Sequence, residues 1–370
     1  RLYLPDEVIG WHVPEPRRWA RFWAWRWTSE FGSDLNDRPN SDRSIFQRML
    51  KLMTRFSGLL RLLATSLFCT SLTVPTFAQD QAGPTVAAPP GTAVALRPNI
   101  LLVLADDLGY GDLACYGNTE IKSPNLDRFA AQGLKLTSCY AAAANCSPAR
   151  TGLMTGRTPF RVGIYNWIPM LSPMHVRRSE ITVATLLRNS GYDTAHVGKW
   201  HLNGEFNMPT QPQPWDHGFN DWFSTQNNAL PNHRNPNNFV RNGQPVGQLE
   251  GYAAEIVADE AIRWLDEERD PDRPFFLYTC FHEPHEPIAS AKRYTDLYPS
   301  DDPSYSAHHG NVTQLDDAFG RLIAALDRLD IRDDTLVIFT SDNGPAITSI
   351  HPHGSAGPLR AKKGHLYDGG

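Results

Sequence analysis

Cysteine is scarce in this sequence, with five residues in a chain of 370. So few cysteines cannot organise a fold of this size through a disulfide framework. Excess basic charge is also lacking, because the formal net charge is −5 and no block of lysine or arginine stands out. A nucleic acid would find no general electrostatic attraction, and we expect no nucleic-acid partner. Any preference for an anionic ligand must come from a local group of cationic side chains.

A hydrophobic run long enough to span a bilayer is missing as well. The apolar run from Leu62 to Val74 has about 13 residues, whereas a spanning helix needs about 20. It follows a basic stretch and precedes the small residue Ala78, which is the layout of a secretory signal. Residues 49–78 therefore predict a signal peptide and an exported, periplasmic or extracellular protein without a stable membrane span. A membrane anchor is the alternative interpretation.

Two further segments precede the predicted domain. Residues 1–48 hold five of the ten tryptophans and lack hydrophobic periodicity, which indicates a non-native or disordered lead sequence. A genuine tryptophan-rich extension that packs on the domain is the alternative. Residues 79–96 are rich in proline, alanine, glycine and threonine, a composition typical of a flexible leader. We expect one catalytic domain over residues 97–370.

Apolar strands alternate with amphipathic helices throughout this domain. The pattern predicts strands over 99–105, 192–197, 274–280 and 335–340, and helices over 124–132, 180–190, 252–268 and 311–329. Such alternation predicts an α/β fold with a mostly parallel sheet sandwiched by helices.

Residues 203–250 interrupt this rhythm with asparagine, proline and glutamine and few aliphatic residues, so we expect a functional loop or an insertion there. Its aromatic, histidine and amide side chains have two open interpretations, a sugar-binding rim or loop packing: Trp215, His217, Trp222, Asn227, Asn228 and His233.

Acidic and amide residues follow the first and last predicted strands. Asp106 and Asp107 end one strand, and Asp342 and Asn343 follow another. Ligand sites in open α/β sheets lie at the carboxyl ends of strands, and hard divalent cations take oxygen ligands. Three carboxylates and one amide suit Ca²⁺ better than Mg²⁺, which prefers a tight octahedron, although Mg²⁺ is the alternative. Helix capping and a tight turn are the structural interpretations of the same residues.

Four short stretches carry a family resemblance. The run Cys146-Ser-Pro-Ala-Arg150 resembles the sulfatase signature Cys-x-Pro-x-Arg, and the stretch from Gly191 to Leu202 resembles the second signature of that family. The segments around His285 and around Lys363 resemble further sulfatase stretches. The matches follow the family's order from Arg97 to Gly370.

This resemblance implies a type I sulfatase with the alkaline phosphatase-like fold, which hydrolyses sulfate monoesters. In that family the cysteine is converted to formylglycine by a formylglycine-generating enzyme, and the aldehyde hydrate is the nucleophile. If Cys146 is converted, three cysteines remain after the signal, so at most one disulfide can form. A sulfated small molecule or polysaccharide is the expected substrate.

The resemblance also implies roles for individual residues. Asp106, Asp107, Asp342 and Asn343 match the metal ligands, with modified Cys146 as a further one. Lys199 and Lys363 match the sulfate-binding lysines, although the neighbouring Lys362 competes with Lys363.

His285 matches the histidine that binds sulfate and protonates the leaving oxygen, with His282 as the competing candidate. Asp342 is expected to deprotonate the hydrate, His201 to act as the base in its collapse, and Arg150 to stabilise it. His196, inside a strand, is expected to be a core histidine.

Two other functions remain open. Relatives with the same nucleophile attack phosphorus, so a phosphonate or phosphate ester hydrolase is one alternative. The other is an inactive fragment that binds sulfated glycan, because the family normally continues past the position of Gly370 into a smaller C-terminal subdomain. On that basis we expect the catalytic domain to be truncated here.

Overall fold

The computed structural model describes residues 97–370. The predicted lead sequence, signal peptide and flexible leader therefore lie outside the described residues. Among the residues that are described, no helix is both long and apolar enough to cross a bilayer.

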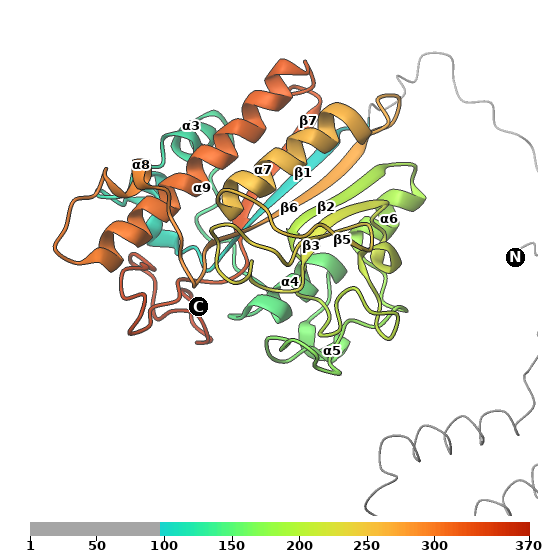
Figure 1. Ribbon diagram of the computed structural model, residues 1–370, viewed down its shortest axis with the longest axis horizontal. Helices are drawn as coiled ribbons and strands as arrows, with labels where there is room; N and C mark the ends of the chain where they lie inside the picture. The colour runs from blue at the N-terminus through green and yellow to red at the C-terminus, as the bar shows by residue number, and fades with distance from the viewer. Residues whose placement is uncertain (1–96) are drawn as a thin grey trace, which may run out of the picture. The chain divides into compact units, whose positions relative to one another are not determined.

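A seven-stranded sheet forms the centre of this part of the chain (Figure 1). The strand order is β5-β4-β3-β2-β6-β1-β7. Strands β3, β2, β6, β1 and β7 run parallel to one another. At one edge, β4 pairs antiparallel with both β3 and β5. The strands are β1 (Asn99–Asp106), β2 (Asp193–Lys199), β3 (Asp221–Thr225), β4 (Val240–Arg241), β5 (Gln244–Pro245), β6 (Phe275–Pro284) and β7 (Thr335–Ser341). The predicted mostly parallel sheet is confirmed.

Helices cover both faces of this sheet (Figure 1). Alternate residues of β1 belong to two separate cores, because successive side chains of a strand point to opposite faces. Leu101 packs in one core with residues of α7 and α9, and Leu102 packs in the other with residues of α4 and α6. The helices are α3 (Pro124–Gln132), α4 (Cys146–Thr155), α5 (Pro159–Val162), α6 (Val183–Asn189), α7 (Ala253–Arg263), α8 (Lys292–Thr295) and α9 (Pro303–Arg328).

Two elements are longer than the sequence pattern predicts. Strand β6 continues to Pro284, which pairs with Asp106 of β1 after an irregularity in the ladder. Helix α9 begins at Pro303, well before the expected residue 311. Its start carries a cap, because the Asp302 side chain accepts a hydrogen bond from the Ser304 N–H and proline occupies the first turn.

The segment 203–250, for which we expect a functional loop or an insertion, contains short strands that its composition does not indicate. Strand β3 lies there and pairs in parallel with β2, and β4 and β5 extend the sheet beyond it. Strand β3 is short, and it is defined by its partner in the sheet more than by its own residue pattern.

The sugar-rim interpretation of the same segment is wrong for three side chains. His217, Trp222 and His233 are buried and pack the interior. Trp215 is 58% exposed and lies against the guanidinium of Arg188, 5.3 Å from its ring centre.

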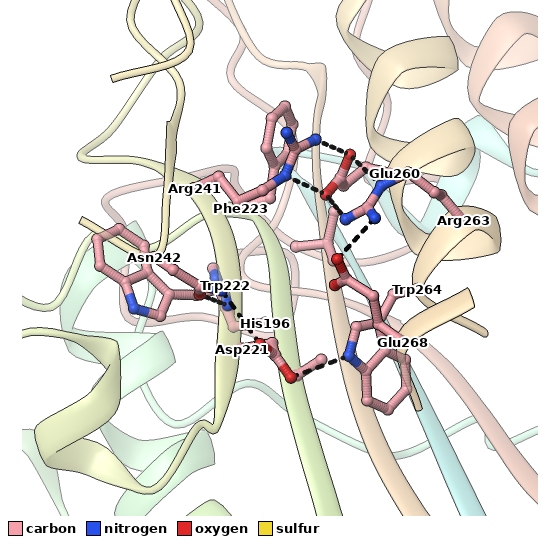
Figure 2. Close-up of a pocket in the computed structure, with 12 residues that line it drawn as sticks. His196, Asp221, Trp222, Phe223, Arg241, Asn242, Glu260, Arg263, Trp264 and Glu268 are labelled. Atoms are coloured by element: carbon pink, nitrogen blue, oxygen red, sulfur yellow. Dashed lines mark hydrogen bonds and ion pairs between the residues drawn. The ribbon is translucent and has the colours of Figure 1, made fainter. Parts of the chain in front are cut away.

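An ion-pair cluster fastens the antiparallel edge of the sheet to helix α7 (Figure 2). Glu260 of α7 is largely buried and accepts hydrogen bonds from Arg241 Nε at 2.9 Å and Arg263 Nη2 at 2.6 Å. Arg263 Nη1 also donates to Glu268 at 2.7 Å. Burial alone would raise the pKa of Glu260, but the two guanidinium groups hold it below its ordinary value.

Candidate active site

The side chains that the sequence singled out meet at the carboxyl edge of the sheet. Asp106 is the last residue of β1, Lys199 is the last residue of β2, and Asp342 directly follows β7. These parallel strands are brought together by β6, which pairs with both β1 and β2. Side chains far apart in sequence therefore share one edge, as expected for a ligand site in an open α/β sheet.

Four of these side chains form a cluster that can hold a metal ion. Potential ligand atoms of Asp106, Asp107, Cys146 and His285 all lie within 4.8 Å of one another. Asn343 joins the cluster, since its Nδ2 donates to Asp107 Oδ1 at 2.7 Å. Asp342 also joins it, because its Oδ1 accepts from the Asp107 N–H at 3.2 Å.

The oxygen donors of this cluster fit a hard divalent cation. Asp106 Oδ1 and Asn343 Oδ1 are buried oxygens without a hydrogen-bond partner within residues 97–370. Leaving a buried polar atom unpaired costs about 1–3 kcal/mol, so such atoms indicate a ligand. Carboxylate and amide oxygens are the ligands that Ca²⁺ and Mg²⁺ take in proteins.

Cys146 is the first residue of helix α4 and is 2% exposed. The unpaired N–H groups at a helix start favour negative charge beside it. Burial nevertheless raises the pKa of the Cys146 thiol to about 12, and the nearby Lys199 only partly opposes this rise. A thiol with that pKa is protonated at neutral pH, so the unmodified side chain would be a poor nucleophile.

Arg150 lies one turn after Cys146 and is buried among acidic side chains. Its Nε donates to Asp342 Oδ2 at 3.0 Å, and its Nη1 donates to the carbonyl oxygen of Lys199 at 2.9 Å. A second carboxylate oxygen, Asp106 Oδ1, lies 3.7 Å from Arg150 Nη2. Arg150 therefore bridges the ends of β1, β2 and β7.

The two buried carboxylates differ in their pKa values. Burial would raise the pKa of Asp106, but Lys199, with its Nζ 2.5 Å from Asp106 Oδ2, and other cations hold it well below the ordinary value. Burial raises the pKa of Asp342 to about 7, with the charge of Asp106 adding to the rise and Arg150 opposing it. A divalent cation bound by Asp342 would lower this pKa and keep the carboxylate charged.

The two candidate histidines of the segment after β6 are placed differently. His285 Nε2 lies 3.5 Å from Asp107 Oδ2 and belongs to the cluster. His282 is a buried strand residue, and its Nε2 lies 2.8 Å from Thr225 Oγ1 of β3. The two lysines near the end of the chain also differ, because Lys363 Nζ is 2.7 Å from Asp107 Oδ1 whereas Lys362 Nζ donates to the carbonyl oxygen of Ile347.

His201 has a left-handed backbone conformation, with φ of 56°. Its Nε2 is 3.1 Å from the carbonyl oxygen of Ile168, and burial holds the pKa of this histidine well below its ordinary value, so the ring is neutral. His196 is buried, as expected for a core histidine, and its Nδ1 lies 2.6 Å from Ser224 Oγ.

Sequence reasoning missed the loop that supports these groups. The carbonyl oxygen of Ile168 contacts His201 Nε2, and the Ile168 N–H donates to Ser147 Oγ at 3.0 Å. Gln226 Nε2 donates to the same carbonyl oxygen at 3.2 Å. These are backbone contacts of an apolar residue, and no local sequence pattern marks them.

The fold and the site together define an α/β protein with a cluster of carboxylates, a histidine and lysines at the carboxyl edge of its sheet that could hold a metal ion. The Sulfatase family model matches residues 98–370, and the chain belongs to this family. The four cysteines of the described region form no disulfide: Cys115, Cys139, Cys146 and Cys280.

Known proteins of this family are similar over much of the chain. N-acetylgalactosamine-6-sulfatase of Sus scrofa is 35% identical over 75% of this chain and 56% of its own length. Arylsulfatase A of Homo sapiens is 36% identical over 76% of this chain and 58% of its own length. The crystal structure of Ps i-CgsB in complex with k-i-k-neocarrahexaose has a TM-score of 0.67 and 29% identity, covering 74% of this chain and 64% of that one. The chain thus spans somewhat more than half of the two sulfatases.

Proposed function

We propose that this chain is the catalytic part of a sulfuric ester hydrolase that cleaves sulfate monoesters with a nucleophile made from Cys146. The observation that carries this proposal is the position of Cys146 at the start of α4, within 4.8 Å of ligand atoms of Asp106, Asp107 and His285. Its relatives at 35% and 36% identity are named sulfatases.

Conversion of Cys146 to formylglycine resolves the difficulty that burial creates for the thiol. The hydrate of an aldehyde supplies an oxygen nucleophile, whereas the buried thiol, with its pKa raised to about 12, supplies almost no thiolate. A formylglycine-generating enzyme is therefore the partner that we propose for maturation.

The chain's own residues would then handle charge and protons. Lys199 and Lys363 would bind the sulfate oxygens, and such preorganised charge is usually the largest catalytic contribution. Asp342, positioned by a hydrogen bond from Arg150 Nε at 3.0 Å, would take the proton from the oxygen at position 146. His201, neutral in its buried setting, would serve as the second base.

His285 would bind the sulfate and protonate the departing alcohol oxygen. Burial lowers the pKa of this histidine, and Asp106 opposes that effect. An anionic ester bound beside the ring would raise this lowered pKa, so His285 would take up its proton together with the substrate.

Asp106, Asp107, Asp342 and Asn343 would hold a divalent cation, which we propose to be Ca²⁺, with Mg²⁺ as the alternative. The cation would neutralise sulfate charge and polarise the ester. A preference for Ca²⁺ rests on the mixed set of carboxylate and amide oxygens, which tolerates irregular geometry.

The substrate class that we propose is a sulfated saccharide. The signal at residues 49–78 would export the protein, so that it acts outside the cytoplasm. The support is indirect: one relative is named for N-acetylgalactosamine-6-sulfate, and one similar structure holds k-i-k-neocarrahexaose. Export is tested by sequencing the amino terminus of the secreted protein, which should begin at Gln79.

The decisive experiment measures the mass of the tryptic peptide 136–150 together with sulfate release. Protein made with a formylglycine-generating enzyme should carry an aldehyde at position 146 and release sulfate from 4-nitrophenyl sulfate. Protein made without it, and the Cys146→Ala variant, should fold and bind cation but release none. Full activity with an intact thiol would remove the proposed nucleophile, and faster turnover of 4-nitrophenyl phosphate than of the sulfate would favour the phosphate ester alternative.

A further inference from the structure

The loop after α5 exposes a group of large apolar side chains beside the candidate active site. Tyr165 is 64% exposed, Trp167 is 45% exposed, and Met170 and Leu171 are 56% and 63% exposed. Single exposed apolar residues are ordinary, but adjacent ones on one loop indicate a surface that binds something.

This loop is held firmly rather than left free. Ile168 is buried, its N–H donates to Ser147 Oγ, and its carbonyl oxygen receives Gln226 Nε2. Farther along, the Leu171 N–H donates to the Gly204 carbonyl oxygen at 2.9 Å. Gly204 approaches so closely that an added Cβ would lie 2.2 Å from the carbonyl oxygen of Ser172. The backbone that carries the exposed side chains is therefore held in place, which lowers the entropy cost of ordering the loop when a ligand binds.

The residues on either side of Trp167 are hydrogen-bonded to the residues on either side of the proposed nucleophile. The residue before it, Asn166, accepts a hydrogen bond from Asn145 Nδ2 at 3.0 Å, and the residue after it contacts Ser147. Asn145 and Ser147 flank Cys146 in the chain. Since the Ile168 side chain points into the core, the exposed Trp167 lies on the solvent side of the same contact, at the rim of the site.

We propose that Trp167 is a substrate-binding residue that stacks on the pyranose ring of a sulfated sugar, an inference that rests on the proposed function. An indole face offers a large, rigid apolar surface that matches the C–H face of a sugar ring. Asn166 lies next to it, and its exposed Nδ2 makes no hydrogen bond to another described residue. A stacking surface with an adjacent amide suits a ligand that has both an apolar face and hydroxyl groups, whereas a simple aryl ring would use only the indole.

The test compares Trp167→Ala with the wild-type chain on N-acetylgalactosamine 6-sulfate, galactose 6-sulfate and 4-nitrophenyl sulfate. Loss of one stacking contact should raise KM for the cleaved sugar sulfate about 10-fold and leave kcat within about twofold, because stacking is equal in ground and transition states. Trp167→Phe should recover most of the loss. Inhibition by inorganic sulfate should not change, since the lysines bind that group.

Trp215→Ala is the matched control, because Trp215 is an exposed tryptophan that packs on Arg188 instead of near Cys146. Equal KM values of the wild type and Trp167→Ala for the cleaved sugar sulfate would overturn the proposal. A rise in KM confined to 4-nitrophenyl sulfate would also overturn it, and so would a wild-type chain that cleaves only this aryl ester. If the wild-type chain releases sulfate from none of the three esters, the proposed function fails. Calorimetric binding of N-acetylgalactosamine 6-sulfate then tests the subsite by itself, and unaltered or absent binding in both proteins would refute it.

Discussion

Replacement of Lys363 by alanine is the sharpest test of how the site handles an anion. Lys363 Nζ lies 2.7 Å from Asp107 Oδ1, and its side chain is 20% exposed, so it faces the cluster while remaining reachable by a ligand. Its pKa is raised above the ordinary lysine value, since the opposing effect of burial is outweighed by the nearby acidic groups, and the side chain is therefore charged.

The expected loss is in catalysis and not in folding. Removing one preorganised charge from a reaction site typically lowers turnover by about 10²- to 10³-fold, and we expect kcat/KM for sulfate ester hydrolysis to fall within that range. Asp107 would keep the bound cation as its positive partner when Lys363 is removed, so the thermal unfolding midpoint of the cation-loaded protein should change little. Affinity for Ca²⁺ should be retained or increase, because a positive charge beside Asp107 has been removed.

Lys362→Ala is the matched control, because this neighbouring lysine donates to the carbonyl oxygen of Ile347 and does not reach the cluster. The assay is steady-state sulfate release together with a calcium titration of both variants. The reasoning is refuted if Lys362→Ala loses as much activity as Lys363→Ala. It is also refuted if Lys363→Ala loses its cation, which would make Lys363 a structural part of the metal site.

Three further outcomes can be measured on the same protein. Chelation of divalent cations should abolish sulfate release, and added Ca²⁺ should restore it; activity that persists after complete chelation, verified by elemental analysis, would contradict a metal-dependent site. Asp316→Ala in α9 should lower the free energy of unfolding by about 2–4 kcal/mol, because the buried Asp316 carboxylate accepts hydrogen bonds from the Leu126 and Asn125 N–H groups at the start of α3. Asp327→Ala, on the exposed side of α9, should change the free energy of unfolding by less than about 0.5 kcal/mol in urea unfolding. The pKa of Glu260 is lowered in the folded chain, so its stabilising contribution is present above the ordinary value of 4.5 and is lost as pH falls through the folded pKa; Glu260→Gln should therefore show a shallower loss of stability between neutral and acidic pH, and parallel curves for the two proteins would contradict this.

The order of strands and helices could be predicted from local patterns because burial imposes periodicity on the sequence itself. The run from Ile100 to Ala105 is apolar because β1 lies between β6 and β7 and is largely buried on both faces. The acidic residues that end it and the residues Asp342 and Asn343 after β7 could be expected to converge, since parallel neighbouring strands end at one edge. Short signatures around Cys146 and Lys199 added the chemistry.

Choices between near neighbours required the folded chain. His282 and His285 are the same residue type three positions apart, but strand β6 extends to Pro284. His282 therefore lies within the strand and contacts Thr225 of β3, whereas His285 lies after the strand and contacts Asp107. Strand β3 itself escaped prediction, because a five-residue strand at 221–225 is stabilised by its pairing with β2. Residue identity and spacing determined which groups this protein has for charge and proton transfer, because those properties belong to side chains and to local periodicity. Tertiary structure placed Lys363 and His285, which the family resemblance favoured, at the cluster, and it alone revealed the Ile168 carbonyl oxygen as the partner of His201. Those distances depend on the path of the chain between elements distant in sequence.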